Sequence, residues 1–204
     1  VAPVAQPLMG EEEIVKPISL DVKVIHQSSP DAPRYAIQAR YPHLSGPGSP
    51  YLPAFNQAAE DFVFAEIGRF KESLAQAGAG ENAEWPGQLE INFLPTVIQP
   101  EIASVLFKIS TLTPGTPHPG NRSSSLTLDL QQGRVLTLAD LFQPGAPYLE
   151  TLSGLCIETL RAQGSLAWED GALPTEENYQ SWNITPEGLL VTFDEYRVAP
   201  YAAG

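Results

Sequence analysis

The chain has 204 residues, of which 43% are hydrophobic and 17% charged, and 24 acidic against 11 basic residues give a formal net charge of -13. A chain of this length buries well over half of its unfolded surface, so it needs no disulfide or metal to fold, and its composition argues against disorder. The negative charge disfavours nucleic acid and anionic lipid as partners, because both require a positive patch; it suits a basic protein partner, although solubility alone also explains it.

The N-terminal region combines a tail with two strands. Residues 1–13 contain two prolines and three consecutive glutamates, and we expect them to form a flexible tail. Apolar and polar residues alternate over residues 18–24 and again over residues 35–41, which predicts an antiparallel pair of strands joined by a turn. No stretch approaches the roughly 20 apolar residues of a membrane helix, so any membrane anchor is expected to lie outside this sequence.

The clearest helix is expected over residues 54–76. Its apolar residues recur at three- and four-residue spacing and form one stripe, which is typical of a helix that packs on a core. Gly78 and Gly80 are expected to end it, because glycine readily adopts the backbone conformation that follows a helix.

The rest of the chain predicts further strands and a second helix. In chain order we expect a β-rich block over 88–129, a hairpin strand over 134–138, a helical turn over 139–142, an amphipathic helix over 148–163, and strands over 182–184 and 189–193. Runs of strands with interspersed helices, without regular βαβ alternation, indicate the α+β class. The expected fold has antiparallel sheets and two main amphipathic helices.

The reactive side chains do not form a familiar catalytic or metal-binding motif. Cys156 is the single cysteine and lies among leucines, so it is interpreted as a small buried hydrophobe. The three histidines lie far apart along the chain, and no nucleotide-binding or hydrolase motif occurs. We therefore expect no enzyme activity, metal or cofactor in this chain.

His118 lies in a loop rich in proline and glycine, Pro114–Gly120. A stiff loop holds a histidine outward with little entropy to lose, which favours a binding contact or a pH-sensitive group. The alternative is a histidine that hydrogen-bonds its own loop.

Asp194 and Glu195 follow a predicted strand. Paired carboxylates serve glycoside hydrolysis when they face each other across a cleft, but adjacent residues of a strand point to opposite faces. A solvated strand end is therefore the preferred interpretation.

Three aromatic residues near the C-terminus, Trp182, Tyr196 and Tyr201, are candidates for a recognition surface, since Tyr and Trp supply much of the binding energy at interfaces. Packing against the second helix is the alternative. The candidate ligand-binding residues are therefore His118, Trp182, Glu195, Tyr196 and Tyr201.

Four segments carry a resemblance to a known family. They are Leu126-Thr127-Leu128-Asp129-Leu130, Leu138-Ala139-Asp140-Leu141-Phe142, Trp182-Asn183-Ile184-Thr185-Pro186-Glu187-Gly188-Leu189 and Tyr196-Arg197-Val198-Ala199-Pro200-Tyr201-Ala202-Ala203-Gly204. They resemble the extracytoplasmic domain shared by RsiV-type anti-sigma factors and PdaC-type peptidoglycan deacetylases, whose C-terminal part is a domain of unknown function. The segment up to about Asn92, including Asn56, resembles the companion segment that precedes it.

The resemblance implies a small N-terminal αβ unit over residues 14–98 and a larger C-terminal αβ unit over residues 99–204. It also implies a location outside the cytoplasmic membrane of a bacterium. The domain would be a binding or sensing module for lysozyme, a basic protein, or for peptidoglycan. The family's usual Gly-Gly-Ala-His loop corresponds here to Pro114-Gly115-Thr116-Pro117-His118, with the histidine kept and the glycines partly replaced by prolines.

Two other functions stay open at this point. One is a cell-wall glycan hydrolase or deacetylase that uses His118 with Asp194 or Glu195. The other is a purely structural domain of a larger envelope protein.

Overall fold

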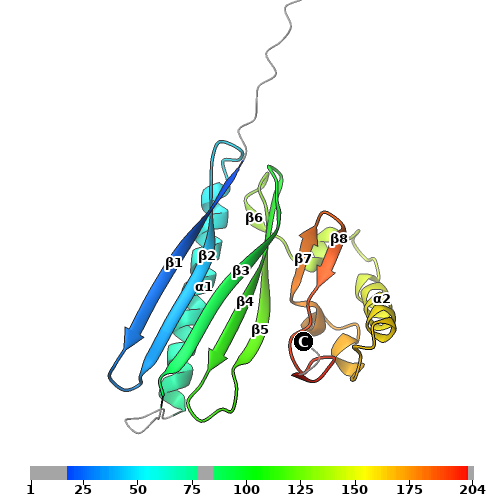
Figure 1. Ribbon diagram of the computed structural model, residues 1–204. Helices are drawn as coiled ribbons and strands as arrows, with labels where there is room; N and C mark the ends of the chain where they lie inside the picture. Colours follow the sequence, from blue (N-terminus) through cyan, green and yellow to red (C-terminus); the bar gives the residue numbers. More distant parts are fainter. Residues whose placement is uncertain (1–17, 78–84, 202–204) are drawn as a thin grey trace, which may run out of the picture.

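The computed structural model describes residues 18–77 and 85–201, which form a large sheet with a long helix and a smaller unit beside it (Figure 1). The expected α+β class is confirmed. The expected tail, residues 1–13, and the two glycines expected to end the first helix, Gly78 and Gly80, lie outside the described residues. The large sheet and its helix comprise β1 (Ser19–Ser29), β2 (Tyr35–Ser45), α1 (Leu52–Gln76), β3 (Gly87–Ile98), β4 (Ile102–Leu112), β5 (Gly120–Asp129) and β6 (Arg134–Val135).

The six strands follow one another in chain order across the sheet. The expected antiparallel pair, β1 with β2, is confirmed along the full length of both strands. Every other neighbouring pair is antiparallel except β2 and β3, which run parallel because α1 returns the chain to the same end of the sheet. The boundary expected between residues 98 and 99 falls in the turn between β3 and β4, which pair within this one sheet.

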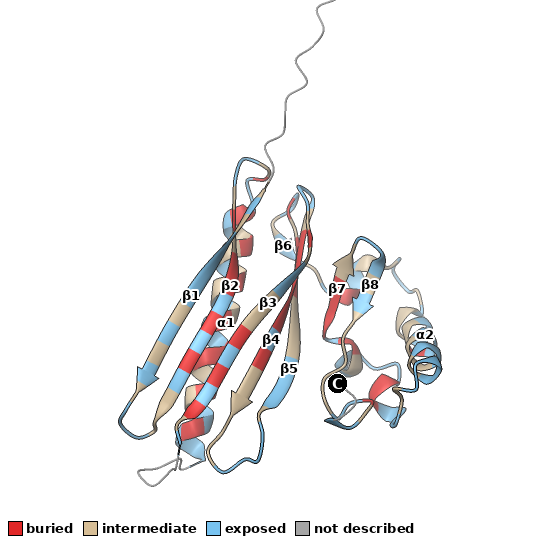
Figure 2. Ribbon diagram, in the orientation of Figure 1, coloured by how far each residue is buried: buried red, intermediate tan, exposed pale blue. Residues whose placement is uncertain are grey.

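The main core lies between α1 and one face of the sheet. The stripe expected along the helix is buried, and Phe55, Val63 and Leu74 are completely covered. Alternate residues of β2 and β3 are buried against it, as the alternating colours of these strands show (Figure 2). The rings of Phe62 and Phe107 stack at 4.4 Å and join the helix to β4.

The side chain of Asn56 ties the start of α1 to β2. Its amide nitrogen donates to the carbonyl oxygen of Leu44 at 2.8 Å, and its carbonyl oxygen accepts from the Leu44 N–H at 2.7 Å. The side chain thereby satisfies two backbone groups at the end of β2, as a neighbouring strand would.

A smaller unit follows β6. It comprises η1 (Leu138–Leu141), α2 (Tyr148–Ala162), η2 (Asp170–Ala172), η3 (Glu176–Tyr179), β7 (Trp182–Thr185) and β8 (Gly188–Val191), the last two forming a two-stranded sheet. Leu149, Leu152 and Cys156 of α2 pack on its apolar cluster, as expected. Cys156 is only half buried, not fully buried as predicted, because α2 lies on the outside of this unit. Burial raises the pKa of its thiol.

β7 joins the smaller unit to the large sheet through buried polar groups. The Asn183 amide nitrogen donates to Ser104 Oγ at 2.9 Å, and the Ile184 N–H donates to the same oxygen at 3.2 Å. Ser104 Oγ also lies 2.7 Å from Thr127 Oγ1. Since Ser104, Thr127 and Asn183 are at most 2% exposed, these bonds fix the unit firmly on β4 and β5. Among the described helices, none is both long enough and apolar enough to span a membrane.

Candidate functional site

Four of the five predicted site residues come together where the chain after β8 meets the β4–β5 hairpin. The rings of His118 and Tyr201 lie 4.6 Å apart between centroids, at an interplanar angle of 37°. The rings of Tyr196 and Tyr201 lie 6.4 Å apart at 28°. We call His118, Tyr201 and Tyr196 the aromatic row. All three are exposed, and Glu195 precedes the row directly in the chain.

Local backbone contacts hold His118 and Tyr196 in place. His118 Nδ1 lies 2.9 Å from the carbonyl oxygen of Pro119, so the histidine bonds its own loop while its ring meets Tyr201. Tyr196 has a φ of 64°, and its N–H donates to the carbonyl oxygen of Ala199. A bulky residue in the left-handed region is strained by roughly 1–2 kcal/mol. Such strain at an exposed aromatic residue is typical of functional sites.

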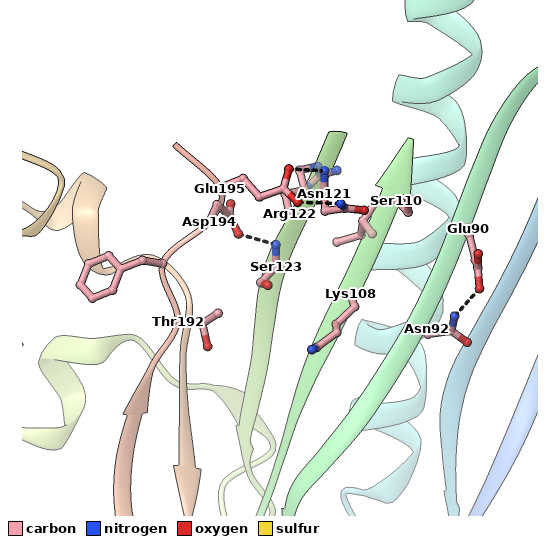
Figure 3. Close-up of a pocket in the computed structure, with 12 residues that line it drawn as sticks. Glu90, Asn92, Lys108, Ser110, Asn121, Arg122, Ser123, Thr192, Asp194 and Glu195 are labelled. Carbon is pink, nitrogen blue, oxygen red and sulfur yellow. Dashed lines mark hydrogen bonds between the residues drawn. The ribbon is translucent and has the colours of Figure 1, made fainter. Parts of the chain in front are cut away.

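Two carboxylates fasten this segment to the free edge of β5. The Ser123 N–H donates to Asp194 Oδ1 at 2.6 Å (Figure 3). Glu195 accepts from the Asn121 N–H at 3.2 Å and from the Asn121 side-chain amide at 2.6 Å. The preferred interpretation of a solvated strand end is therefore wrong in one respect: both side chains pair with backbone amides two residues apart on one strand. Their adjacent positions let them take the place of a neighbouring strand.

Trp182 does not join the aromatic row. It is 5% exposed and packs with Leu138 and Tyr179 in the apolar cluster of the smaller unit. For Trp182, the alternative prediction of packing against the second helix is therefore the one that applies. Tyr196 and Tyr201 are 55% and 41% exposed and stay available for contact. As a core residue, Trp182 has little surface to offer a ligand.

A polar groove runs beside the row, between the segment after β8 and the face of the sheet opposite α1. Its volume is about 450 Å³. Carboxylate, amide, hydroxyl and ammonium groups from three strands and from this segment line it (Figure 3). These are the side chains of Glu90, Asn92, Lys108, Ser110, Asn121, Ser123, Thr192, Asp194 and Glu195.

The charges at the groove are perturbed by burial. Half-burial raises the pKa of Asp194, and the Ser123 N–H and the cations Arg122 and Arg197 only partly oppose this. Burial likewise lowers the pKa of Arg122, although the nearby Asp194 opposes the shift. Charged side chains of both signs, Glu90, Lys108 and Glu195, line the groove beside these two groups.

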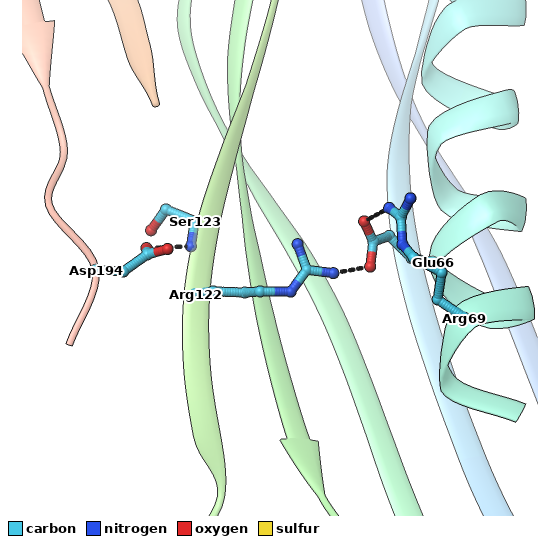
Figure 4. Close-up of polar contacts among 5 residues, drawn as sticks. All are labelled: Glu66, Arg69, Arg122, Ser123 and Asp194. Atoms are coloured by element: carbon cyan, nitrogen blue, oxygen red, sulfur yellow. Dashed lines mark hydrogen bonds and ion pairs between the residues drawn. The ribbon is translucent and has the colours of Figure 1, made fainter. Parts of the chain in front are cut away.

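Arg122, which lines the groove, forms an ion pair with Glu66 that the sequence analysis missed. Arg122 extends from β5 to α1, where it pairs with the buried carboxylate of Glu66, which also pairs with Arg69 (Figure 4). The signal for Glu66 was present: it is a charged residue beside Val63 and Ile67 in the apolar stripe. Nothing local pointed to Arg122 as its partner, 56 residues away.

The described residues contain no cluster of three or more His, Cys, Asp or Glu side chains able to hold a metal ion. The groove offers hydrogen-bonding groups, and the aromatic row follows directly after Glu195, which lines it. Such a pairing suits reversible binding to a partner that offers both apolar and polar surface.

The C-terminal region matches the model of a described family. Residues 139–204 match the family described as a protein of unknown function, DUF3298. This stretch contains Glu195, Tyr196 and Tyr201 but not His118. The match supports the resemblance at the level of a domain of unknown function.

Two solved structures of DUF3298 family proteins share the fold. One, from Bacteroides fragilis NCTC 9343, has a TM-score of 0.60 at 16% identity, covering 92% of this chain and 87% of that chain. Another, from Pseudomonas aeruginosa PAO1, has a TM-score of 0.56 at 14% identity, covering 92% and 88%. At such identities the likeness shows the fold alone. No curated protein matches the chain.

Proposed function

We propose that this chain is a non-catalytic binding module of a bacterial cell-envelope protein, located outside the cytoplasmic membrane, and that the aromatic row is its recognition surface. The observation that carries the proposal is the convergence of His118, Tyr201 and Tyr196, three exposed rings from two distant segments. Burial does not explain why the three rings are fixed in position, because all three are exposed. Hydrogen bonds that Asn121 donates to Glu195, and the turn at Tyr196, hold them instead.

The first partner that we propose is a basic protein such as lysozyme. The net charge of -13 attracts a cationic protein over a distance, which raises the association rate. Tyrosine rings then supply contact area at low entropic cost, and they are enriched among residues that dominate binding energy. The resemblance to the RsiV-type domain points to the same class of partner.

Titration of the purified chain with hen lysozyme, at about 0.15 M and about 1 M salt, tests this proposal. We expect the affinity for lysozyme to be lower at high salt. The double variant, Tyr196→Ala with Tyr201→Ala, should bind more weakly than the wild type at both salt concentrations. Phe64→Ala is the matched control, because Phe64 is an exposed ring, 49% accessible, on the outer side of α1. If no binding is seen at either salt concentration, lysozyme is excluded as the partner. If the double variant binds as well as the wild type, the aromatic row is not the recognition surface.

The groove supports a second candidate partner, cell-wall glycan. Amides, hydroxyls and carboxylates suit the hydroxyl and amide groups of a sugar chain, and the adjacent rings offer a stacking surface. A soluble peptidoglycan fragment is the probe. Because a sugar chain is bound mainly through hydrogen bonds and stacking, its affinity should change little with salt and should fall in Asn92→Ala. If the affinity for the fragment depends strongly on salt and is the same in Asn92→Ala as in the wild type, the glycan proposal is contradicted.

We do not propose the hydrolase alternative. The carboxylates that it needs, Asp194 and Glu195, already accept hydrogen bonds from the β5 edge, and His118 Nδ1 is engaged by its own loop. In the described part of the chain no hydrogen bond joins His118 to either carboxylate, so these side chains are not arranged as an acid–base pair. Their hydrogen bonds support a structural role, which is to hold the recognition surface in a fixed conformation.

A further inference from the structure

The two sides of the large sheet end differently. Beyond β5, the backbone amides of Asn121 and Ser123 are taken up by Glu195 and Asp194. On the opposite side β1 is the last strand, and within residues 18–77 and 85–201 no strand pairs with its outer edge (Figure 1). Such an edge presents a row of N–H and C=O groups and is a template for another strand.

β1 lacks most of the features that usually protect an edge, although Asp21 and Lys23 place two charges on it. It is 11 residues long, contains no proline, and pairs with β2 without a bulge. Gln27 accepts a hydrogen bond from Lys71 of α1 and Ile25 packs on the main core, so the odd-numbered residues of the second half of β1 face the helix. Near the start of the strand, Leu20 also packs on this core. Val22 and Val24 lie on the other face and are 43% and 51% exposed. Length, regularity and exposed valines all favour pairing with a further strand.

We propose that β1 pairs antiparallel with β1 of a second copy of this chain, about a two-fold axis at Val22. In this register Asp21 lies opposite Lys23 of the second copy, and Lys23 opposite its Asp21. Val22 meets its own counterpart, and Val24 lies opposite Leu20. Directly opposite residues of an antiparallel pair have Cβ atoms about 4.5–5.5 Å apart, close enough for both kinds of contact.

The charges of β1 select this register over its neighbours. An axis at Asp21 or at Lys23 would place like charges opposite each other. An axis at Val24 would oppose Lys23 to Ile25 and so would lose both ion pairs. The axis at Val22 uses one patch twice, as a closed two-fold dimer requires.

The register also fixes how the two copies lie. Residues that are directly opposite in an antiparallel pair point to the same face, so both α1 helices would cover the same face of the joined sheet. The aromatic rows lie beyond β5, at the two far ends, and would stay free. The dimer would therefore present two binding surfaces without altering either, which makes this proposal independent of the identity of the partner.

Sedimentation equilibrium over a concentration series up to about 1 mM tests the pairing, because a single strand edge forms an interface of the small, transient class. We expect a reversible monomer–dimer equilibrium. Asp21→Lys and Lys23→Asp each place like charges opposite each other twice, and each should weaken dimerisation roughly tenfold. Asp21→Lys combined with Lys23→Asp in one chain should restore it.

An equimolar mixture of the two single variants is the most specific arm. The chain with two lysines should pair with the chain with two aspartates, although neither should dimerise well alone. Glu72→Lys on the exposed side of α1 is the charge-matched control and should leave the equilibrium unchanged. Asp21 and Lys23 are exposed, so the circular dichroism spectrum should be unchanged in every variant. A chain that stays monomeric throughout, or a dimer that both single variants leave intact, would overturn the proposal.

Discussion

The guanidinium of Arg122 on β5 donates a hydrogen bond to the carboxylate of Glu66, which faces the sheet from α1 with 2% of its side chain exposed (Figure 4). Arg69, three residues further along the helix, donates to the other carboxylate oxygen. A buried carboxylate keeps its charge only when such partners are present. This pair therefore ties the strand that carries the site to the helix that carries the core.

Loss of Arg122 should destabilise the fold. Arg122→Ala leaves Glu66 short of a partner, and we expect the free energy of unfolding to fall by about 2 kcal/mol, less than for a fully buried pair because water reaches Arg122. Urea denaturation measures it. Arg69→Ala is the control and should cost at most about 1 kcal/mol, since Arg69 is 61% exposed. Glu66→Gln should recover part of the loss in the Arg122→Ala background; no recovery would mean that the charge is not the cause.

Asp194 should make stability depend on pH in an unusual direction. Its pKa is raised above the ordinary value of 3.8, chiefly by burial, so the folded state holds the proton more tightly than the unfolded state does. The contribution of this group is therefore greatest below pH 3.8 and is lost as pH rises through the raised pKa. Asp194→Asn keeps the acceptor for the Ser123 N–H without the charge.

The melting temperature of Asp194→Asn, relative to the wild type, should therefore rise as pH increases from about 3 to 7. Asp61→Asn, on the exposed side of α1, controls for the removal of one carboxylate. If the difference in melting temperature between Asp194→Asn and the wild type is constant over this pH range, burial does not raise the pKa of Asp194.

Local periodicity predicted the elements well because alternation and helical spacing are properties of neighbouring residues. The strand pair before α1 and the stripe along α1 were both confirmed. The same patterns cannot predict which distant side chain pairs with a strand edge or with a buried charge on a helix. Glu66 and Arg122, or Glu195 and Asn121, meet across 56 and 74 residues, so only the folded chain brings them together.

The aromatic residues show the same limit at the site. In the sequence, Trp182 and Tyr201 were equal candidates for a recognition surface. Trp182 is buried because β7 docks on β4 through Asn183 and Ser104. Tyr201 is exposed because the chain has by then crossed to the His118 loop. Long-range docking, rather than residue type, decides which ring can meet a partner.

Asn56 should be important for stability although it does not line the groove. Asn56→Ala removes both hydrogen bonds to Leu44, whose side chain is 1% exposed, and leaves two backbone groups unpaired. We expect a loss of about 1–3 kcal/mol in the free energy of unfolding, measured by urea denaturation. Asn92→Ala is the matched control, because the Asn92 side chain donates to the carboxylate of the exposed Glu90 rather than to buried backbone. Equal costs for the two variants would contradict the role of the Leu44 contacts.

Tyr196 offers a test that separates binding from stability at one residue. Tyr196→Ala and Tyr196→Gly both remove the ring from the aromatic row, so both should weaken binding of the partner equally. They differ in the backbone, because glycine adopts a φ of 64° without the strain that alanine retains. Tyr196→Gly should therefore be more stable than Tyr196→Ala by about 1 kcal/mol in thermal or urea unfolding.

The wild-type chain completes the comparison. If its stability is at or below that of Tyr196→Gly, the tyrosine is retained at a strained position at a cost to the fold, as expected of a residue that serves recognition. If Tyr196→Gly is instead clearly less stable than both the wild type and Tyr196→Ala, the ring contact with Tyr201 and the limited freedom of the unfolded chain outweigh the strain. In that case Tyr196 is a structural residue, and the recognition surface must be sought in the groove.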